Sequence, residues 1–337
     1  MIYDFALEPE LVATWHDRRV AYPFLSHMGL GQRRVHCAYP SAAWKKLVMN
    51  AFRASISDEK SPQGQNARKH MEVLLQHLAE TGTRRSGRLQ EGETWLKAAI
   101  REHAEFPFGG IVVRSFAGMH SEVIAADRIG AEDCPAWTPA APPVVRQPQE
   151  LANALAPLLR CATHVRFVDP YFDPEVREFF EPMKEYLLVA QKRRSVYELR
   201  VQIHFAIRRD EVERLSSIRG RLITEVELAK ERVAACEDRL RPLLHSRVSV
   251  RAFAWGQRSG GAKMHNRYVL TELGGVAVQT GLDQSPRSGR ETDDLTVLSK
   301  EQHEARWSQY REESITYPLL ADRVFTGSAS QTGEMGG

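Results

Sequence analysis

Three side chains that can bear positive charge occupy alternate positions of one short stretch. Lys263, His265 and Arg267 precede the apolar run YVLT and the pair Gly274–Gly275. Alternate residues of a β-strand point to the same face, so this spacing predicts that the three side chains lie together. The glycine pair predicts a two-residue hairpin turn, because both central positions of the favoured turn need positive φ angles.

A histidine between two cations suits phosphodiester chemistry. A neutral imidazole can attack phosphorus and carry a covalent intermediate, while ammonium and guanidinium groups hold the phosphate oxygens. The hairpin register puts Thr280 opposite Val269, on the same face as the histidine. A carboxylate would orient the ring, and the sequence offers Asp283, Asp293 and Asp294. This mechanism needs no metal.

The same residues also have a purely structural interpretation. On a half-exposed strand, His265 and Arg267 would form ion pairs with Asp293 or Asp294. Structural ion pairs are commoner than active sites, so the pattern alone leaves both interpretations open.

A second polar cluster follows the apolar run HVRFV. In the segment DPYFD, Asp169 and Asp173 come where carboxylates commonly end a strand and cap a helix. Asp173 and Pro174 predict the N-cap and first turn of the next helix. Tyr171 is expected either to line a groove on which bases stack or to be buried beside the core. We count Asp169, Tyr171 and Asp294 among the candidate substrate-binding residues.

Strands alternate with helices through the C-terminal half. The hydrophobic periodicity predicts helices over residues 150–162, 175–190 and 223–246. It predicts strands over residues 164–168, 198–207, 248–255, 263–272, 274–280 and 295–299. This alternation indicates an α/β fold in which helices cover both faces of a mixed sheet.

The N-terminal half, residues 1–133, is also predicted to be α/β. Its expected strands cover 33–39, 109–116 and 122–127, its expected helices cover 41–52, 67–81 and 93–105, and SPQGQN (61–66) is expected to be a loop. The proline-rich stretch 134–149 has neither helical nor strand periodicity and predicts a linker. We therefore expect two domains, 1–133 and 150–325, and a flexible tail over 326–337.

Composition narrows the class of protein. The chain has 337 residues and a net charge of +3, too small to indicate a partner by itself. Its four cysteines lack CxxC spacing, which argues against a zinc ribbon, a redox pair or a disulfide framework. No stretch approaches the roughly 18 unbroken apolar residues of a membrane span. We expect a soluble, cytoplasmic protein without metal or other cofactor.

The segment HNRYVLTE resembles the phospholipase D superfamily motif HxKxxxxD. His265, Arg267 and Glu272 stand at the positions of its His, Lys and Asp. The resemblance covers roughly residues 150–320 and includes QTGLD, where the family has GSxN. It implies a phospholipase D-like mixed sheet flanked by helices and a metal-independent phosphodiesterase.

The resemblance also implies roles for individual residues. His265 would be the nucleophile or acid, and Arg267 would bind phosphate together with Thr280 or Asp283. Because Arg267 replaces a lysine, Lys263 would supply the missing ammonium. The carboxylate of Asp283 would repel phosphate unless Arg267 paired with it.

The family's site usually combines two motifs, and one is evident here. HSEVIAAD (120–127) has comparable spacing, so the N-terminal half could be a diverged lobe of the same kind. The other route is a homodimer in which two copies of His265 face each other across a two-fold axis.

The expected function is a metal-independent phosphodiesterase acting on nucleic acid, in bacterial defence against foreign DNA and as part of a larger defence complex. Two alternatives remain. HxR followed by GLD is similar to the phospholipase D-like C-terminal domains of MIT-domain proteins, which bind phosphoinositide headgroups without catalysing. The chain could therefore be an inactive nucleic-acid or phosphate-binding subunit. It could also bind anionic lipid at a membrane surface, although it has no polybasic run.

Overall fold

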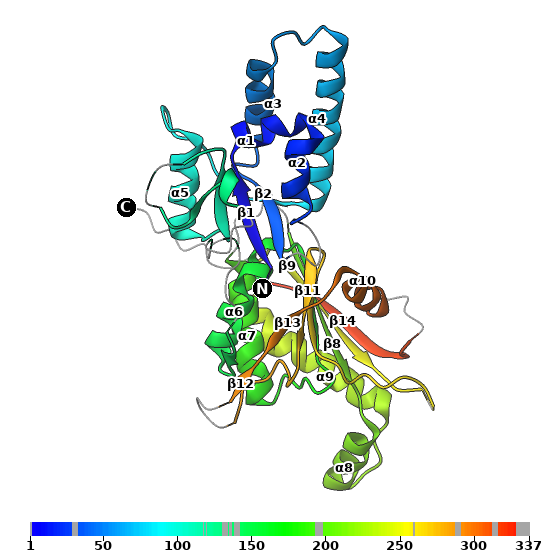
Figure 1. Cartoon of the computed structure of the whole chain (residues 1–337). Coiled ribbons are helices and arrows are strands. Elements are labelled where there is room, and N and C mark those ends of the chain that lie inside the picture. Colours follow the sequence, from blue (N-terminus) through cyan, green and yellow to red (C-terminus); the bar gives the residue numbers. More distant parts are fainter. Residues whose placement is uncertain are drawn as a thin grey trace. The chain divides into compact units, whose positions relative to one another are not determined.

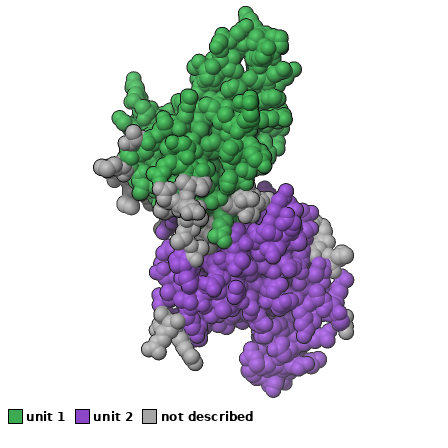
Figure 2. All heavy atoms as spheres, viewed as in Figure 1, with its two compact units in different colours: residues 1–141, 194–196 green, residues 142–193, 197–337 purple. Residues whose placement is uncertain are grey.

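The chain divides into two compact units, which Figures 1 and 2 show in ribbon and space-filling form. Unit 1 comprises Met1–Ala141 and Arg194–Val196, and unit 2 comprises Pro142–Arg193 and Tyr197–Gly337. Each combines helices with a β-sheet, so the protein is of the mixed α/β class. The computed structural model describes residues 2–28, 33–116, 118, 120–129, 134, 137, 142–192, 198–258, 260–286, 291–311 and 316–327.

Unit 1 is built on a parallel sheet in the order β3-β2-β1-β4-β5. Its strands are β1 (Tyr3–Leu7), β2 (Arg34–Ala38), β3 (Thr83–Arg84), β4 (Gly110–Val113) and β5 (Val123–Ala125). Its helices are α1 (Pro9–Ala13), α2 (Arg18–Leu25), α3 (Trp44–Ser55), α4 (Pro62–Thr81) and α5 (Trp95–Glu105). The predicted loop over 61–66 is wrong, because Ser61 caps α4 by accepting a hydrogen bond from the Gly64 amide.

Both faces of this sheet are covered. Phe5 and Leu7 of β1 belong to a buried cluster that includes residues of α3 and α4. Ala6 points to the opposite face, where it joins a cluster with α5. Every residue of β4, GIVV, is buried. A strand that is covered on both faces is expected to have such a continuous apolar sequence.

Unit 2 contains a seven-stranded mixed sheet in the order β13-β11-β10-β7-β8-β9-β14. Its strands are β7 (His164–Val168), β8 (Leu199–Ala206), β9 (Val248–Trp255), β10 (Tyr268–Thr271), β11 (Gly274–Val278), β13 (Leu295–Val297) and β14 (Leu319–Thr326). Its helices are α6 (Pro148–Cys161), α7 (Arg177–Gln191), α8 (Arg209–Arg219), α9 (Glu225–Leu240) and α10 (Lys300–Gln309). A separate two-stranded sheet pairs β6 (Val144–Val145) with β12 (Thr292–Asp293).

The central strand β7 packs against a helix on each face. The Phe167 ring stacks on Tyr186 of α7. The neighbouring residue Val168 points the other way, into a buried cluster with Tyr310, which follows α10. Helices thus cover both faces of the mixed sheet, as the alternation of elements predicts.

The two units differ in sheet topology. Every strand pair in the sheet of unit 1 is parallel, whereas in unit 2 only β7, β8 and β9 are parallel neighbours. The strands β10, β11, β13 and β14 are all antiparallel to their neighbours. The two sheets therefore do not share a strand arrangement, and that the N-terminal half is a diverged lobe stays a prediction.

The hairpin of β10 and β11 turns two residues earlier than the glycine pair predicts. Thr271 pairs with Gly274, so the turn consists of Glu272 and Leu273. The Thr271 hydroxyl closes it by donating to the Gly274 carbonyl at 2.9 Å and accepting from the Leu273 amide at 3.2 Å. Gly275 lies within β11, and a Cβ there would stand 2.7 Å from Leu270. This position therefore needs a glycine for packing and not for a turn.

Three further predictions need correction. In the corrected register Val276, not Thr280, lies opposite Val269. The expected linker 134–149 contains strand β6 and the start of α6. Helix α7 begins at Arg177, and Asp173 instead accepts from the Glu175 amide in the turn before it. The part of the predicted tail that follows residue 327 lies outside the described residues.

Glu272 is expected to stabilise unit 2, because its carboxylate fastens the hairpin turn to the start of β7. It accepts from the Thr163 hydroxyl at 2.7 Å and from the His164 amide at 2.9 Å. Glu272→Ala should lower the free energy of unfolding, measured by urea denaturation, by about 2–3 kcal/mol. Glu304→Ala, which removes an exposed carboxylate from α10, should cost at most about 0.5 kcal/mol. Equal effects of the two variants would contradict this role.

Candidate functional site

A cavity of about 370 Å³ opens at the carboxyl ends of β7 and β8 in unit 2. Open sheets with parallel strands characteristically bind ligands at this edge. The start of α7, the start of α8 and the segments flanking the β10–β11 hairpin complete the walls. The lining residues are Asp169, Tyr171, Asp173, Val176, Phe179, Arg208, Glu211, Arg214, Arg267, Thr280 and Asp283.

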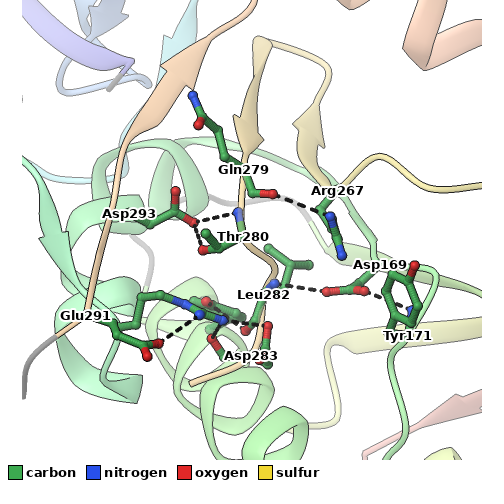
Figure 3. A network of polar contacts seen from close by, with 11 residues as sticks. Asp169, Tyr171, Arg267, Gln279, Thr280, Leu282, Asp283, Glu291 and Asp293 are labelled. Atoms are coloured by element: carbon green, nitrogen blue, oxygen red, sulfur yellow. Dashed lines mark hydrogen bonds and ion pairs between the residues drawn. The ribbon is translucent and has the colours of Figure 1, made fainter. Parts of the chain in front are cut away.

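Asp169 lies at the base of this site and connects two of its walls (Figure 3). Its side chain is 2% exposed. One carboxylate oxygen accepts from the Tyr171 amide and the other from the Leu282 amide, each at 2.9 Å. Burial raises the pKa of this carboxyl, and the two backbone hydrogen bonds offset part of that effect. The negative charge of Asp283 raises the pKa further, and the positive charge of Arg267 lowers it.

Gly281 allows Asp283 to turn back toward Asp169. Its φ is +136°, and a Cβ at this position would lie 2.2 Å from the Asp283 carboxylate. Asp283 pairs with Arg146 at 2.8 Å, and Arg146 also reaches Glu291 at 3.4 Å. Burial raises the pKa of the Asp283 carboxyl, and Arg146 partly offsets that effect. The arginine that pairs with Asp283 is thus Arg146, where the sequence suggested Arg267.

Thr280 is held by a carboxylate from the other side of the site. Its amide donates to Asp293 at 3.1 Å, and its hydroxyl donates to the same oxygen. Figure 3 shows this pair beside Gln279. The candidate Asp294 is exposed and does not line the cavity, because neighbouring residues of an extended segment point in opposite directions. The acid that contacts Thr280 is therefore Asp293.

Arg267 and Tyr171 form the cationic and aromatic wall. The Arg267 guanidinium carbon lies 4.9 Å from the centre of the Tyr171 ring, and that of Arg208 lies 5.0 Å from it. Arg267 donates a long hydrogen bond of 3.4 Å to the Gln279 carbonyl. Its buried Nε has no hydrogen-bond partner among the described residues. Tyr171 is 40% exposed, so its ring remains accessible to a ligand.

The structure does not bring Lys263 and His265 into this cavity. Strand β10 begins at Tyr268, so the expected alternation of Lys263, His265 and Arg267 on one strand face is wrong. Lys263 and His265 are exposed in the segment before the strand. The Nδ1 of His265 lies 2.9 Å from the Lys263 carbonyl. A carbonyl only accepts, so this nitrogen is the donor, and in the neutral ring Nε2 carries the lone pair.

Several residues of the site have no counterpart in the sequence analysis. Arg208 is the N-cap of α8 and Arg214 lies in the middle of this helix, which is too polar to show an apolar periodicity. Arg232 of α9 holds the acidic wall, since it binds Glu211 through two hydrogen bonds and Asp173 at 2.8 Å. Among these residues, the sequence gives a signal for Arg208, which follows shortly after the apolar strand β8.

The described part of the chain contains neither a membrane-spanning helix nor a cluster of metal ligands. No described helix has the length and apolar character required to cross a membrane. No three His, Cys, Asp or Glu side chains within the described ranges are arranged to hold a metal ion.

Asp169→Asn is expected to remove part of the pH dependence of stability. The native carboxyl has a raised pKa, so it keeps its proton at pH values where the unfolded group, with its ordinary value of 3.8, has lost it. The resulting stabilisation is complete below 3.8 and is lost as the pH rises through the native pKa. The free energy of unfolding of the wild type minus that of the variant should therefore fall over this interval. Urea denaturation at stepped pH measures it, and a difference that rises with pH would contradict the raised pKa.

Comparisons with known proteins identify no family for this chain. No protein-family model matches the sequence, and no curated protein matches it. A function for the chain is therefore inferred from the chemistry of the residues that line the cavity.

Proposed function

We propose that unit 2 is a phospholipase D-like domain that binds phosphate groups of nucleic acid in the cavity above Asp169. The observation that carries this proposal is that Arg208, Arg214 and Arg267 line the same cavity as Tyr171. Guanidinium groups bind phosphate oxygens through paired N–H donors, and aromatic rings stack on bases. The cavity therefore offers both kinds of group that a nucleic acid requires.

Arginines hold most of the acidic residues that line the cavity. Arg232 pairs with both Asp173 and Glu211, and Arg146 pairs with Asp283. These pairs offset part of the negative charge that faces Arg208, Arg214 and Arg267. In a partly buried site the charges of these groups are screened less by salt than exposed charges would be.

Arg267 is the residue best placed to contact phosphate. It lines the cavity and has a buried Nε–H without a partner among the described residues. A buried donor without a partner costs about 1–3 kcal/mol, so a phosphate oxygen that accepts from it would recover that free energy. The exposed His265 lies outside the cavity lining, so binding is supported better than cleavage.

We expect binding of DNA to weaken with salt and to depend on Arg267. Fluorescence anisotropy with a labelled oligonucleotide, from about 50 mM to about 200 mM salt, should give a linear fall of log affinity with log salt concentration. Arg267→Gln should lower the affinity for all sequences and reduce the salt slope by about one. Arg251→Gln is the matched control, because Arg251 pairs with Asp322 outside the cavity lining. Unchanged binding by Arg267→Gln would overturn the proposal.

A second candidate function is metal-independent cleavage of the bound phosphodiester by His265. The observation that favours it is the hydrogen bond from Nδ1 to the Lys263 carbonyl, which leaves the Nε2 lone pair available for attack on phosphorus. Because the histidine is exposed, a second copy of the chain could approach it. We therefore also propose a homodimer in which two copies of His265 form one site. One imidazole attacks phosphorus and breaks the P–O bond, and the other acts as the general acid that protonates the leaving oxygen. Water then hydrolyses the P–N bond and regenerates the free histidine.

The cleavage hypothesis predicts nuclease activity that survives EDTA. Single- and double-stranded DNA and RNA are incubated with the protein in the presence of EDTA. Light scattering measures the mass of the active species, which is expected to be a dimer. His265→Ala should abolish cleavage without weakening binding. His245→Ala, which removes another exposed histidine of unit 2, should leave cleavage unchanged. Salt-dependent binding without cleavage would support phosphate binding in the cavity and reject cleavage by His265.

A further inference from the structure

The cavity presents two walls of different chemistry. One wall carries Arg208 and Arg267 beside the ring of Tyr171. The other wall carries the carboxyl groups of Asp169 and Asp283, which Figure 3 shows and which both lie near Gly281. A bare phosphate matches the first wall, while the second wall repels it. The ligand that matches both walls has N–H donors close to a phosphate.

Asp283 is the carboxylate able to accept from such a ligand. One of its oxygens pairs with Arg146, and its side chain remains 24% exposed. A carboxylate has about four lone-pair sites, so Asp283 keeps accepting capacity toward the cavity. Asp169, in contrast, uses both oxygens on backbone amides.

The remaining walls suit a flat ring. Val176 and Phe179, from the start of α7, line the cavity together with Tyr171, which is 40% exposed. The volume of about 370 Å³ lies near the lower end of the range for small-molecule sites, about 300–1,000 Å³. A cavity of this size suits a ligand as small as one nucleotide.

We infer that the cavity takes one unpaired nucleotide, with its phosphate on Arg267 and Arg208 and an amino group of its base on Asp283. The inference rests on the proposed function and names its substrate class. Stacking on Tyr171 and contact with Asp283 need a base that has left its stack, so the base must be unpaired or turned out of the helix. Cytosine, adenine and guanine carry an amino group, and thymine lacks one.

Binding of short single strands with equal phosphate number separates base recognition from phosphate recognition. Labelled ten-nucleotide strands of cytosine, of thymine and of abasic sites are titrated by fluorescence anisotropy, beside a duplex of the same length. The cytosine strand should bind at least about tenfold more tightly than the abasic strand, because stacking and the amino contact are both lost without a base. The thymine strand should lie between them, and the duplex should bind more weakly than the cytosine strand.

Two variants identify the groups responsible. Asp283→Asn should abolish the preference for cytosine over thymine and leave binding of the abasic strand unchanged or tighter. Asp322→Asn is its matched control, since that aspartate also pairs with an arginine but lies outside the cavity lining. Tyr171→Leu should bring the affinity of the thymine strand down to that of the abasic strand. Asp169 accepts from the backbone amide of Tyr171, so this substitution keeps that hydrogen bond.

Three outcomes would overturn the inference, and they bear differently on the proposed function. Equal affinity for all single strands, with a salt slope that depends on Arg267, would reject base recognition and keep phosphate binding. Equal affinity for duplex and single strands would also reject only the unpaired nucleotide. Binding to phosphatidylcholine or phosphatidylethanolamine vesicles without binding to any nucleic acid would reject both, since those headgroups also join a phosphate to a cation.

Discussion

The buried carboxyl group of Asp169 is the interaction on which the candidate site depends. It accepts from the Tyr171 amide and the Leu282 amide, and so joins the segment after β7 to the segment after β11. A buried polar group without partners would be costly, and these two backbone donors make its position favourable. Both walls of the cavity follow from this contact, because Tyr171 belongs to one and the segment reaching Asp283 to the other.

The position of Arg267 depends in turn on the register of β10. Tyr268 pairs with Val168 on one side and Ala277 on the other, which brings Arg267 beside the end of β7. The Glu272 carboxylate and the Thr271 hydroxyl hold the turn of the hairpin. A slip of one residue would send Arg267 to the opposite face of the sheet, so the turn and the site are coupled although they lie at opposite ends of β10.

The sequence predicts the regular elements of the sheet better than it predicts their pairing. Strands β8 and β9 and helix α9 were found because their apolar residues recur with clear periods. Strand β14 was missed because Phe325 is its one buried residue, and helix α8 because Glu211 is its one buried residue. The hairpin turn was misplaced because a glycine pair indicates a turn and also permits close packing, and in β11 Gly275 serves the second purpose.

The candidate site also contains residues that local sequence patterns indicate and residues that they do not. Asp169, Tyr171, Arg267, Thr280 and Asp283 were chosen from the sequence, and all five line one cavity. Polar residues at strand ends gather at one edge of a sheet, which is why local patterns were sufficient for them. Arg146, which neutralises Asp283, lies 137 residues away in sequence, and no local pattern indicates such a pair. His265 was placed by extending a strand that begins after it.

The carboxyl groups of the cavity bear on selectivity more than on affinity. Without Asp283 the guanidinium groups would face one acid fewer, and the site would discriminate less among phosphates. An acid within the cavity lowers the affinity for ligands that bring only negative charge, and it does so without a steric barrier. A ligand with a correctly placed N–H donor removes that penalty by bonding to the acid. Arg146 limits the penalty by holding the carboxylate from behind. The pairing of Asp283 with a buried arginine is thus consistent with a site that discriminates among phosphate-bearing ligands by what else they carry.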